Sequence, residues 1–254
     1  MTSRPWILAE SHWPDVRDAR YEVALLPWGA TEPHNTHLPY ATDTIQSEAV
    51  AIEAARLAWA RGAKVVVLPA IPYGVQTGQK GLPLSINVNP STQSLLLADI
   101  ATSVAGSGVR KLVVVNGHGG NSFRQHIREL QGKLPLLIAE VDWYRLADPK
   151  GHFTDPGDHA GELETSVVQH LRPELVAPLD MAGPGKARRS RITAFREGWA
   201  WTPRKWTDVT DDTGVGDPRA ATSAKGAAYF TQVALQLSGF LVELAAADPN
   251  ALYE

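Results

Sequence analysis

Alternating strand and helix patterns constrain this chain more than any other feature of its sequence. Valine-rich runs such as residues 64–69 and 111–115 are typical of strands buried on both faces, as in parallel sheets. Between such runs, apolar residues recur at helical spacing. This order predicts an α/β fold with three αβα layers and a mainly parallel sheet. We expect strands at residues 22–27, 64–69, 111–115 and 136–141, and helices at residues 44–61, 91–106, 122–131 (opened by a Ser122–Gln125 capping box), from about 159, and 219–244.

A chain of 254 residues is long enough for one α/β domain, and we expect residues 1–254 to form a single one. Residues 184–218 contain many Gly, Pro, Arg and Trp residues with little periodicity. We interpret this segment as a long irregular excursion that serves as a lid or a subunit contact.

Composition excludes several kinds of partner and site. A net charge of −3 supplies no basic field for nucleic acid or an anionic membrane. No apolar run approaches the ~20 residues that span a bilayer, and residues 1–18 lack the apolar core of a signal peptide, so we expect a cytoplasmic protein. Because the chain has no cysteine, disulfides, thiolate ligands and a cysteine nucleophile are excluded. Any metal must be bound by His and carboxylate side chains.

Polar and aromatic residues gather where the expected strands end. In parallel sheets, ligands bind outside the carboxyl ends of the strands, so the segments that follow them should converge on one rim. Candidates for the lining of a substrate pocket at this rim are Trp28, Tyr73, Gln76, Gly119 and Trp143.

The first polar cluster contains Glu32, His34, His37 and Asp43. Glu32 and His34 are spaced to face the same way on an extended segment, or to reach two adjacent metals from a loop; taken alone, they are better explained as polar loop residues. Asp43 precedes an expected helix and fits an N-cap, a role that a metal ligand can combine with. His37 is either a ligand or a residue that orients one.

The glycine-rich loop at residues 116–121 surrounds His118. Such a strand–loop–helix turn can bind phosphate on helix amides. The loop, however, matches neither GxGxxG nor a P-loop, and it has no lysine where phosphate needs one. We therefore favour His118 as a metal ligand.

A third cluster, residues 158–164, holds Asp158, His159, Glu162 and Glu164. On a helix, His159 and Glu162 would share one face and Glu164 would point elsewhere. The dipole of a helix start explains the acids but not the histidine.

These clusters match a known pattern in order along most of the chain. The segment from Leu26 to His34, with His37-Leu38-Pro39 and Thr42-Asp43, resembles the opening motif of the creatininase family. The second and third motifs of that family are similar to residues 116–121 and 159–166, and its C-terminal segment is similar to Gly216-Asp217-Pro218, Ala221-Thr222 and Lys225-Gly226.

The resemblance implies a layered α/β fold, a centre of two divalent metal ions (Zn²⁺ or Mn²⁺), a homo-oligomer (often a hexamer) and hydrolysis of non-peptide C–N bonds. By position, Glu32 and His118 would bind one metal and His34 the other, with Asp43 bridging them. His159 would match the catalytic histidine of the family, with Asp158 tuning it.

Two departures from the family pattern bear on the substrate. Creatininase itself has an aromatic residue and a ligand glutamate directly after the histidine of the second motif, where this chain has Gly119 and Gly120. We expect Glu164, or else Glu162, to supply the missing ligand. The tryptophan that covers creatinine is also absent before the third motif, so creatinine as substrate does not follow.

The hypothesis is therefore hydrolysis of a small-molecule amide by a metal-activated water, with His159 donating a proton to the leaving nitrogen. A cyclic amide or imide is the first candidate substrate; a formamide on a ring-opened purine and a short peptide are alternatives. A second hypothesis is a metal-free protein that keeps the fold and binds a small molecule.

Overall fold

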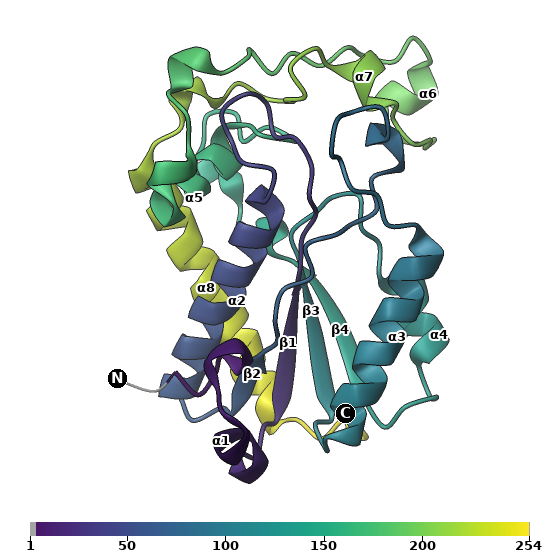
Figure 1. Cartoon of the computed structure of the whole chain (residues 1–254), viewed down its shortest axis with the longest axis vertical. Coiled ribbons are helices and arrows are strands. Elements are labelled where there is room, and N and C mark those ends of the chain that lie inside the picture. Colours follow the sequence, from purple (N-terminus) through teal and green to yellow (C-terminus); the bar gives the residue numbers. More distant parts are fainter. Residues whose placement is uncertain (1–3, 254) are drawn as a thin grey trace.

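The computed structural model describes residues 4–253, which include a four-stranded parallel sheet with helices on both faces (Figure 1). The expected three-layer α/β fold is confirmed. The strands, in the spatial order β2-β1-β3-β4, are β1 (Val23–Trp28), β2 (Val65–Val67), β3 (Lys111–Asn116) and β4 (Leu137–Asp142). The helices are α1 (Trp13–Asp18), α2 (Thr42–Ala60), α3 (Pro90–Gly106), α4 (Arg124–Leu130), α5 (Glu162–Leu171), α6 (Thr193–Arg196), α7 (Trp206–Val209) and α8 (Ser223–Ala246).

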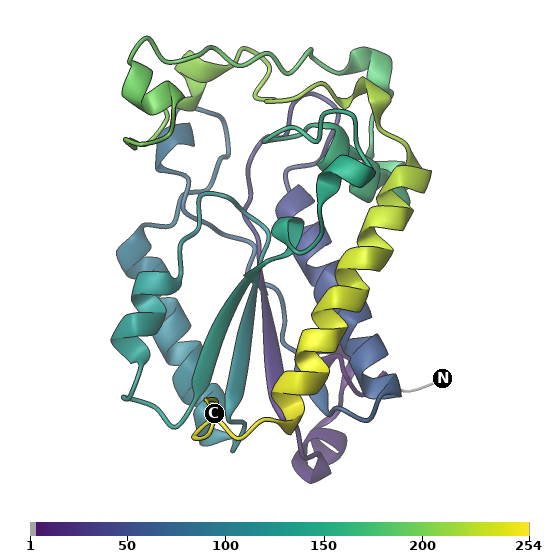
Figure 2. The same cartoon turned by 180° about the vertical axis from the view of Figure 1, so that it is seen from behind.

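Two apolar cores hold the layers together, because successive strand residues point to opposite faces of the sheet. Leu25 and Val113 pack on one face with α2, α5 and α8. Leu26 and Val114 pack on the other face with α3 and α4. Helix α8 runs along the length of the sheet face that it covers together with α2 and α5 (Figure 2).

The strand order reverses between β1 and β3. From β1 the chain passes through α2 to β2 on one side, and from β3 it passes through α4 to β4 on the other. The crevice at the carboxyl ends of such a strand pair is where open parallel sheets bind ligands. Residues 29–43 and 117–121 leave β1 and β3 at this crevice.

Three helix starts differ from the expectations. The Ser122–Gln125 capping box is wrong, because Phe123 occupies the N-cap of α4 and its ring is buried against Trp28 at a centroid distance of 4.9 Å. Helix α5 begins at Glu162, which leaves His159 outside it. Helix α8 begins after Thr222, whose side chain accepts a hydrogen bond from the Lys225 amide.

Residues 184–218 lie across the end of the molecule that carries the carboxyl ends of the strands, and their only α-helices are α6 and α7 (Figures 1 and 2). Within the described chain, residues 4–253, no helix is long and apolar enough to cross a membrane.

Candidate metal centre

Three carboxylates and three imidazoles from separate segments meet at the crevice between β1 and β3. The loop after β1, the first turn of α2, the loop after β3 and the start of α5 each contribute. Five of the six side chains are buried and the sixth is partly buried. The six residues are Glu32, His34, Asp43, His118, His159 and Glu164.

Asp43 directs its two oxygens toward two different imidazoles. Its Oδ1 lies 3.0 Å from His34 Nε2, and its Oδ2 lies 3.1 Å from His118 Nδ1. The expected N-cap role is wrong, because Ala41 occupies the N-cap of α2 and Asp43 already lies inside the first turn. Its carboxylate is therefore available to bridge two metal ions.

Two sets of potential ligands share this carboxylate. Glu32, Asp43 and His118 form one set, and His34, Asp43 and Glu164 form the other; within each set, the ligand atoms lie within 4.8 Å of one another. Glu32 Oε1 lies 2.8 Å from His118 Nδ1 in the first set. Glu164 Oε2 lies 4.0 Å from His34 Nε2 in the second. This arrangement suits two cations side by side.

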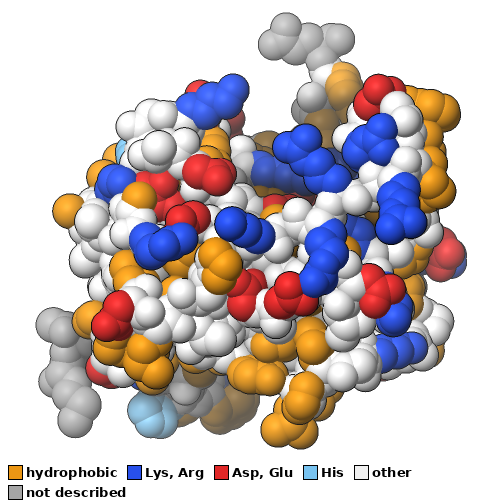
Figure 3. Space-filling model, turned by 90° about the horizontal axis from the view of Figure 1, so that it is seen from above, with side chains coloured by type: hydrophobic (Ala, Val, Ile, Leu, Met, Phe, Trp, Pro, Cys, Tyr) orange, Lys and Arg blue, Asp and Glu red, His pale blue; other side chains and the backbone are white. Residues whose placement is uncertain are grey.

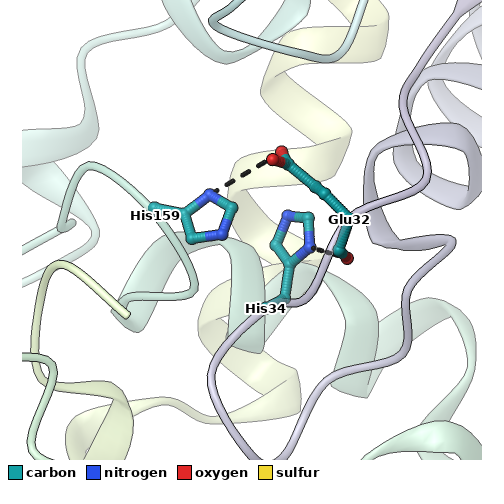
Figure 4. Close-up of side chains that lie close together, drawn as sticks. All are labelled: Glu32, His34 and His159. Carbon is teal, nitrogen blue, oxygen red and sulfur yellow. Dashed lines mark hydrogen bonds and ion pairs between the residues drawn. The ribbon is translucent and has the colours of Figure 1, made fainter. Parts of the chain in front are cut away.

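Each of the three imidazoles has one ring nitrogen at a main-chain carbonyl and the other at the centre. His34 Nδ1, His118 Nε2 and His159 Nε2 lie 3.1, 3.0 and 2.9 Å from these oxygens. An N–H donated to a carbonyl leaves the lone pair of the opposite nitrogen facing the centre, as metal-binding histidines require. The rings of His34 and His159 stack with their centroids 4.2 Å apart (Figure 4). The carbonyls belong to Glu32, Val75 and Pro33.

The charges of the cluster fit divalent cations. Burial lowers the pKa of His34, but Asp43, Glu164 and Glu32 outweigh it and raise this pKa to about 10. Burial also lowers the pKa of His118, yet Glu32 and Asp43 hold it well above its usual range. The carboxylates therefore favour positive charge at the positions that the two imidazoles surround. Asp43 Oδ2 is buried and, apart from its 3.1 Å approach to His118 Nδ1, has no partner with hydrogen-bond geometry in residues 4–253, as suits a metal-ligand atom.

Glu164 lies at the cluster and Glu162 does not. Glu164 Oε2 accepts a hydrogen bond from the Ala160 amide at 2.5 Å beside His34. Glu162 instead accepts from Lys225 Nζ at 2.5 Å and from two backbone amides. The two residues are separated by about 200° around α5, so only one can face the metals. The expected shared face of His159 and Glu162 is wrong, because His159 precedes the helix.

Gly120 explains why no carboxylate stands next to His118 Nε2. A Cβ at Gly120 would lie 2.2 Å from the Val75 oxygen and 2.4 Å from His118 Nε2, inside the hydrogen bond that orients this imidazole. A Cβ at Gly119 would have Tyr144 Oη as its nearest neighbour, at 4.0 Å. Position 120 therefore excludes a side chain, whereas position 119 is open.

Several predicted pocket residues lie elsewhere. Trp28 and Trp143 are fully buried in the two cores, so the prediction that they form a pocket wall is wrong. The indole of Trp28 donates a hydrogen bond to the Tyr73 carbonyl at 2.9 Å. Tyr73 is exposed, whereas Gln76 is buried.

Asp158 and His37 contact neighbours other than the expected ones. Asp158 is exposed and pairs with Arg204 at 2.8 Å, and among residues 4–253 it forms no hydrogen bond with His159. Its predicted tuning role therefore has no supporting contact. His37 Nε2 lies 2.8 Å from the Thr165 hydroxyl of α5, and His37 belongs to neither ligand set.

Sequence reasoning missed three neighbours of the centre. The amide nitrogen of Gln79 donates to Glu32 Oε2. Trp206 packs edge-on against His159 with the ring centroids 5.2 Å apart, and Tyr144 faces Gly119. The polar loop at residues 73–80 was a signal for Gln79, but nothing in the sequence points to the other two, because their contacts span long stretches of chain.

Comparisons with known proteins agree with this geometry. The family model described as "Creatininase: Creatinine amidohydrolase" matches residues 9–241. The mycofactocin precursor peptide peptidase of Mycobacterium tuberculosis is 33% identical over 225 residues, which cover 81% of this chain and 79% of that protein. Creatinine amidohydrolase of Pseudomonas putida is 28% identical over 176 residues, 61% of this chain and 66% of that protein. A solved structure from Bacteroides fragilis NCTC 9343, described as a proposed creatinine amidohydrolase, is 43% identical, with a TM-score of 0.94 and 100% of both chains covered.

Proposed function

The chain belongs to the creatininase family of hydrolases, and on this premise we propose that it is a two-metal hydrolase that cleaves an amide bond of a short peptide. The observation that carries the proposal is the Asp43 carboxylate, whose oxygens face two separate ligand sets. Two sets that share one carboxylate are the arrangement of a two-metal hydrolytic site.

The protein would hold one cation with Glu32, Asp43 and His118 and the other with His34, Asp43 and Glu164. The donor set of imidazole nitrogens and carboxylate oxygens suits zinc or manganese. Two such cations would lower the pKa of a bound water and polarise the amide carbonyl of the substrate.

His159 is placed to move a proton in this reaction. Its Nε2 lies 2.9 Å from the Pro33 carbonyl, so its Nδ1 faces the centre, 3.9 Å from Glu32 Oε1. The edge of Trp206 and the stacked ring of His34 restrict the imidazole and shield it from water. From this position, Nδ1 can accept a proton and transfer it to the leaving nitrogen.

Two observations favour a peptide over the cyclic amide that the sequence placed first. One is the identity to a peptide peptidase over about four fifths of the chain. The other is that residues 186–206 contain seven Lys and Arg residues and one Glu, a net charge of +6 in a chain whose net charge is −3.

This basic segment lies across the end of the molecule where the metal centre is. Figure 3, which looks down on that end, shows Lys and Arg side chains around a hollow. Arg188, Arg204 and Lys205 pair with Asp211, Asp158 and Asp208. The other four basic side chains of the segment can attract a substrate that carries a carboxylate, as a peptide does at its C-terminus. A cyclic amide or imide is the second candidate, favoured by the identity to a creatinine amidohydrolase.

The test combines metal analysis with a substrate panel. We expect about two equivalents of zinc or manganese per chain by plasma mass spectrometry, and hydrolysis of short peptides that is faster with a free than with an amidated C-terminus. Ring opening of cyclic amides or imides without peptide cleavage would favour the second candidate. A chain that binds neither metal when the ion is in excess would contradict the two-metal function and favour the metal-free binding protein.

We also propose that residues 184–218 contact another copy of this chain. Trp199 and Trp201 are 73% and 83% exposed on this segment, and exposed tryptophans of this kind are typical of interfaces. Light scattering after gel filtration should show an oligomer, and Trp199→Ser with Trp201→Ser should shift it toward the monomer. An unchanged oligomer would contradict this assignment.

A further inference from the structure

Tyr144 has a hydroxyl beside the metal centre to which the mechanism above assigns no role. Tyr144 lies in a short turn directly after β4, at the same sheet edge as the ligands. Its main-chain carbonyl accepts a hydrogen bond from the Tyr229 hydroxyl at 2.9 Å, and its ring packs edge-on against Trp143 with the centroids 6.1 Å apart. These contacts fix the ring, while the side-chain hydroxyl forms no hydrogen bond within the described chain, residues 4–253.

The open space at Gly119 is what this hydroxyl faces. A Cβ built on Gly119 would have Tyr144 Oη, 4.0 Å away, as its only neighbour within that distance. Gly119 directly follows the ligand His118 and is exposed. Because residue 119 has no side chain, the hydroxyl borders accessible volume next to a metal ligand.

The surroundings keep this group a hydrogen-bond donor. Burial raises the pKa of Tyr144 well above its usual range, and the carboxylates of Asp142, Asp43 and Glu164 add to this effect against the opposing charge of Arg145. A phenol with such a pKa stays protonated at every pH at which the protein is folded and active.

We propose that Tyr144 donates a hydrogen bond to the oxygen of the amide that is cleaved, from the side opened by Gly119. This inference rests on the proposed hydrolytic function. A fixed neutral donor stabilises the negative charge that develops on that oxygen, and it needs no proton transfer to do so. Tyr144 is then a catalytic residue, supplied by β4 rather than by any of the three motifs.

The isosteric variant Tyr144→Phe tests the proposal. We expect kcat/KM to fall by roughly 10- to 100-fold, as for the loss of one donor to a developing charge. Metal content and thermal stability should stay at their wild-type values, and the pH–rate profile should keep its shape, since the lost group does not titrate in the working range. Tyr21→Phe is the matched control: it removes a hydroxyl that bonds the Pro5 carbonyl, at the strand-start end of the sheet, and should leave kcat/KM unchanged.

A second variant supplies a new hydroxyl donor from position 119, across the open space from residue 144. The backbone of Gly119 is not in the left-handed region and a Cβ there meets no close atom, so Gly119→Tyr introduces no backbone strain and no clash at Cβ. In the Tyr144→Phe background it should restore part of the lost kcat/KM.

The possible outcomes distinguish this proposal from the proposed hydrolytic function on which it rests. If Tyr144→Phe keeps kcat/KM within about twofold of the wild type with full metal content, the proposal is overturned and the hydrolytic function stands. If the variant loses metal, Tyr144 has a structural role and the proposal is also overturned. A wild type that hydrolyses no amide overturns both.

Discussion

Alanine at position 120 should damage the metal centre, whereas alanine at position 119 should leave it intact. The added methyl of Gly120→Ala would lie 2.2 Å from the Val75 oxygen and 2.4 Å from His118 Nε2, so both contacts are about 1 Å shorter than an ordinary contact and both must be relieved. Overpacking of this kind costs about 1–3 kcal/mol. Loss of the partly buried hydrogen bond between these two atoms adds about 1–3 kcal/mol. We therefore expect the free energy of unfolding to fall by roughly 2–6 kcal/mol.

Metal binding should fall for the same reason. The Val75 carbonyl orients the imidazole of His118, and removal of such an orienting partner typically lowers metal affinity by roughly 10–100-fold. Gly119→Ala adds the same methyl group one residue earlier, with only the Tyr144 hydroxyl nearby, and it serves as the matched control.

Urea unfolding and zinc titration of both variants measure these two effects separately. The reasoning would be refuted if Gly120→Ala bound zinc as tightly as Gly119→Ala and unfolded at the same urea concentration. Lower stability with unchanged zinc affinity would refute only the link from position 120 to His118.

Three further outcomes are expected. Glu164→Gln should lower the metal content per chain while Glu162→Gln leaves it at the wild-type value, both by plasma mass spectrometry; the reverse result would exchange their roles. Chelation of the bound metal should lower the melting temperature, since a ligand at 100 times its dissociation constant stabilises a fold by about 2.7 kcal/mol, and an unchanged melting temperature would argue against a bound ion in the folded state. Burial raises the pKa of Glu162, but Lys225 and the amides of residues 154 and 155 lower it more, so this pKa lies below its ordinary value. The charged Glu162 carboxylate therefore stabilises the fold fully above the ordinary glutamate pKa, and this stabilisation is lost as the pH falls through the lowered value. The difference in unfolding free energy between wild type and Glu162→Gln should accordingly shrink on acidification below about pH 4.5, and a difference that grows instead would contradict this sign.

Local patterns were sufficient to predict the fold class and most residues of the candidate metal centre. The strands are recognisable because β-branched runs such as residues 111–115 suit a sheet covered on both faces. The ligands are recognisable because His and carboxylate residues that follow neighbouring parallel strands are brought to one edge whatever the details of the loops. The family assignment, which rests on the order of the motifs, is confirmed by the match over residues 9–241.

The directions in which side chains point could not be predicted from the sequence. In the sequence Asp43 fits a helix N-cap, yet α2 starts one residue before it. Neither carboxylate oxygen is therefore used to cap the helix. Trp28 and Trp143 stand at strand ends as pocket residues would, yet both rings turn into the cores.

The sequence by itself determined the architecture and which residue types meet at the edge of the sheet. Only the tertiary structure decided that Glu164 and not Glu162 lies at the candidate metal centre, because this depends on the residue at which α5 begins. It also decided which nitrogen each imidazole offers, because main-chain carbonyls such as that of Val75, 43 residues before His118, fix the ring. Composition and periodicity arise from neighbours along the chain, whereas these choices arise from contacts between segments that only the folded chain brings together.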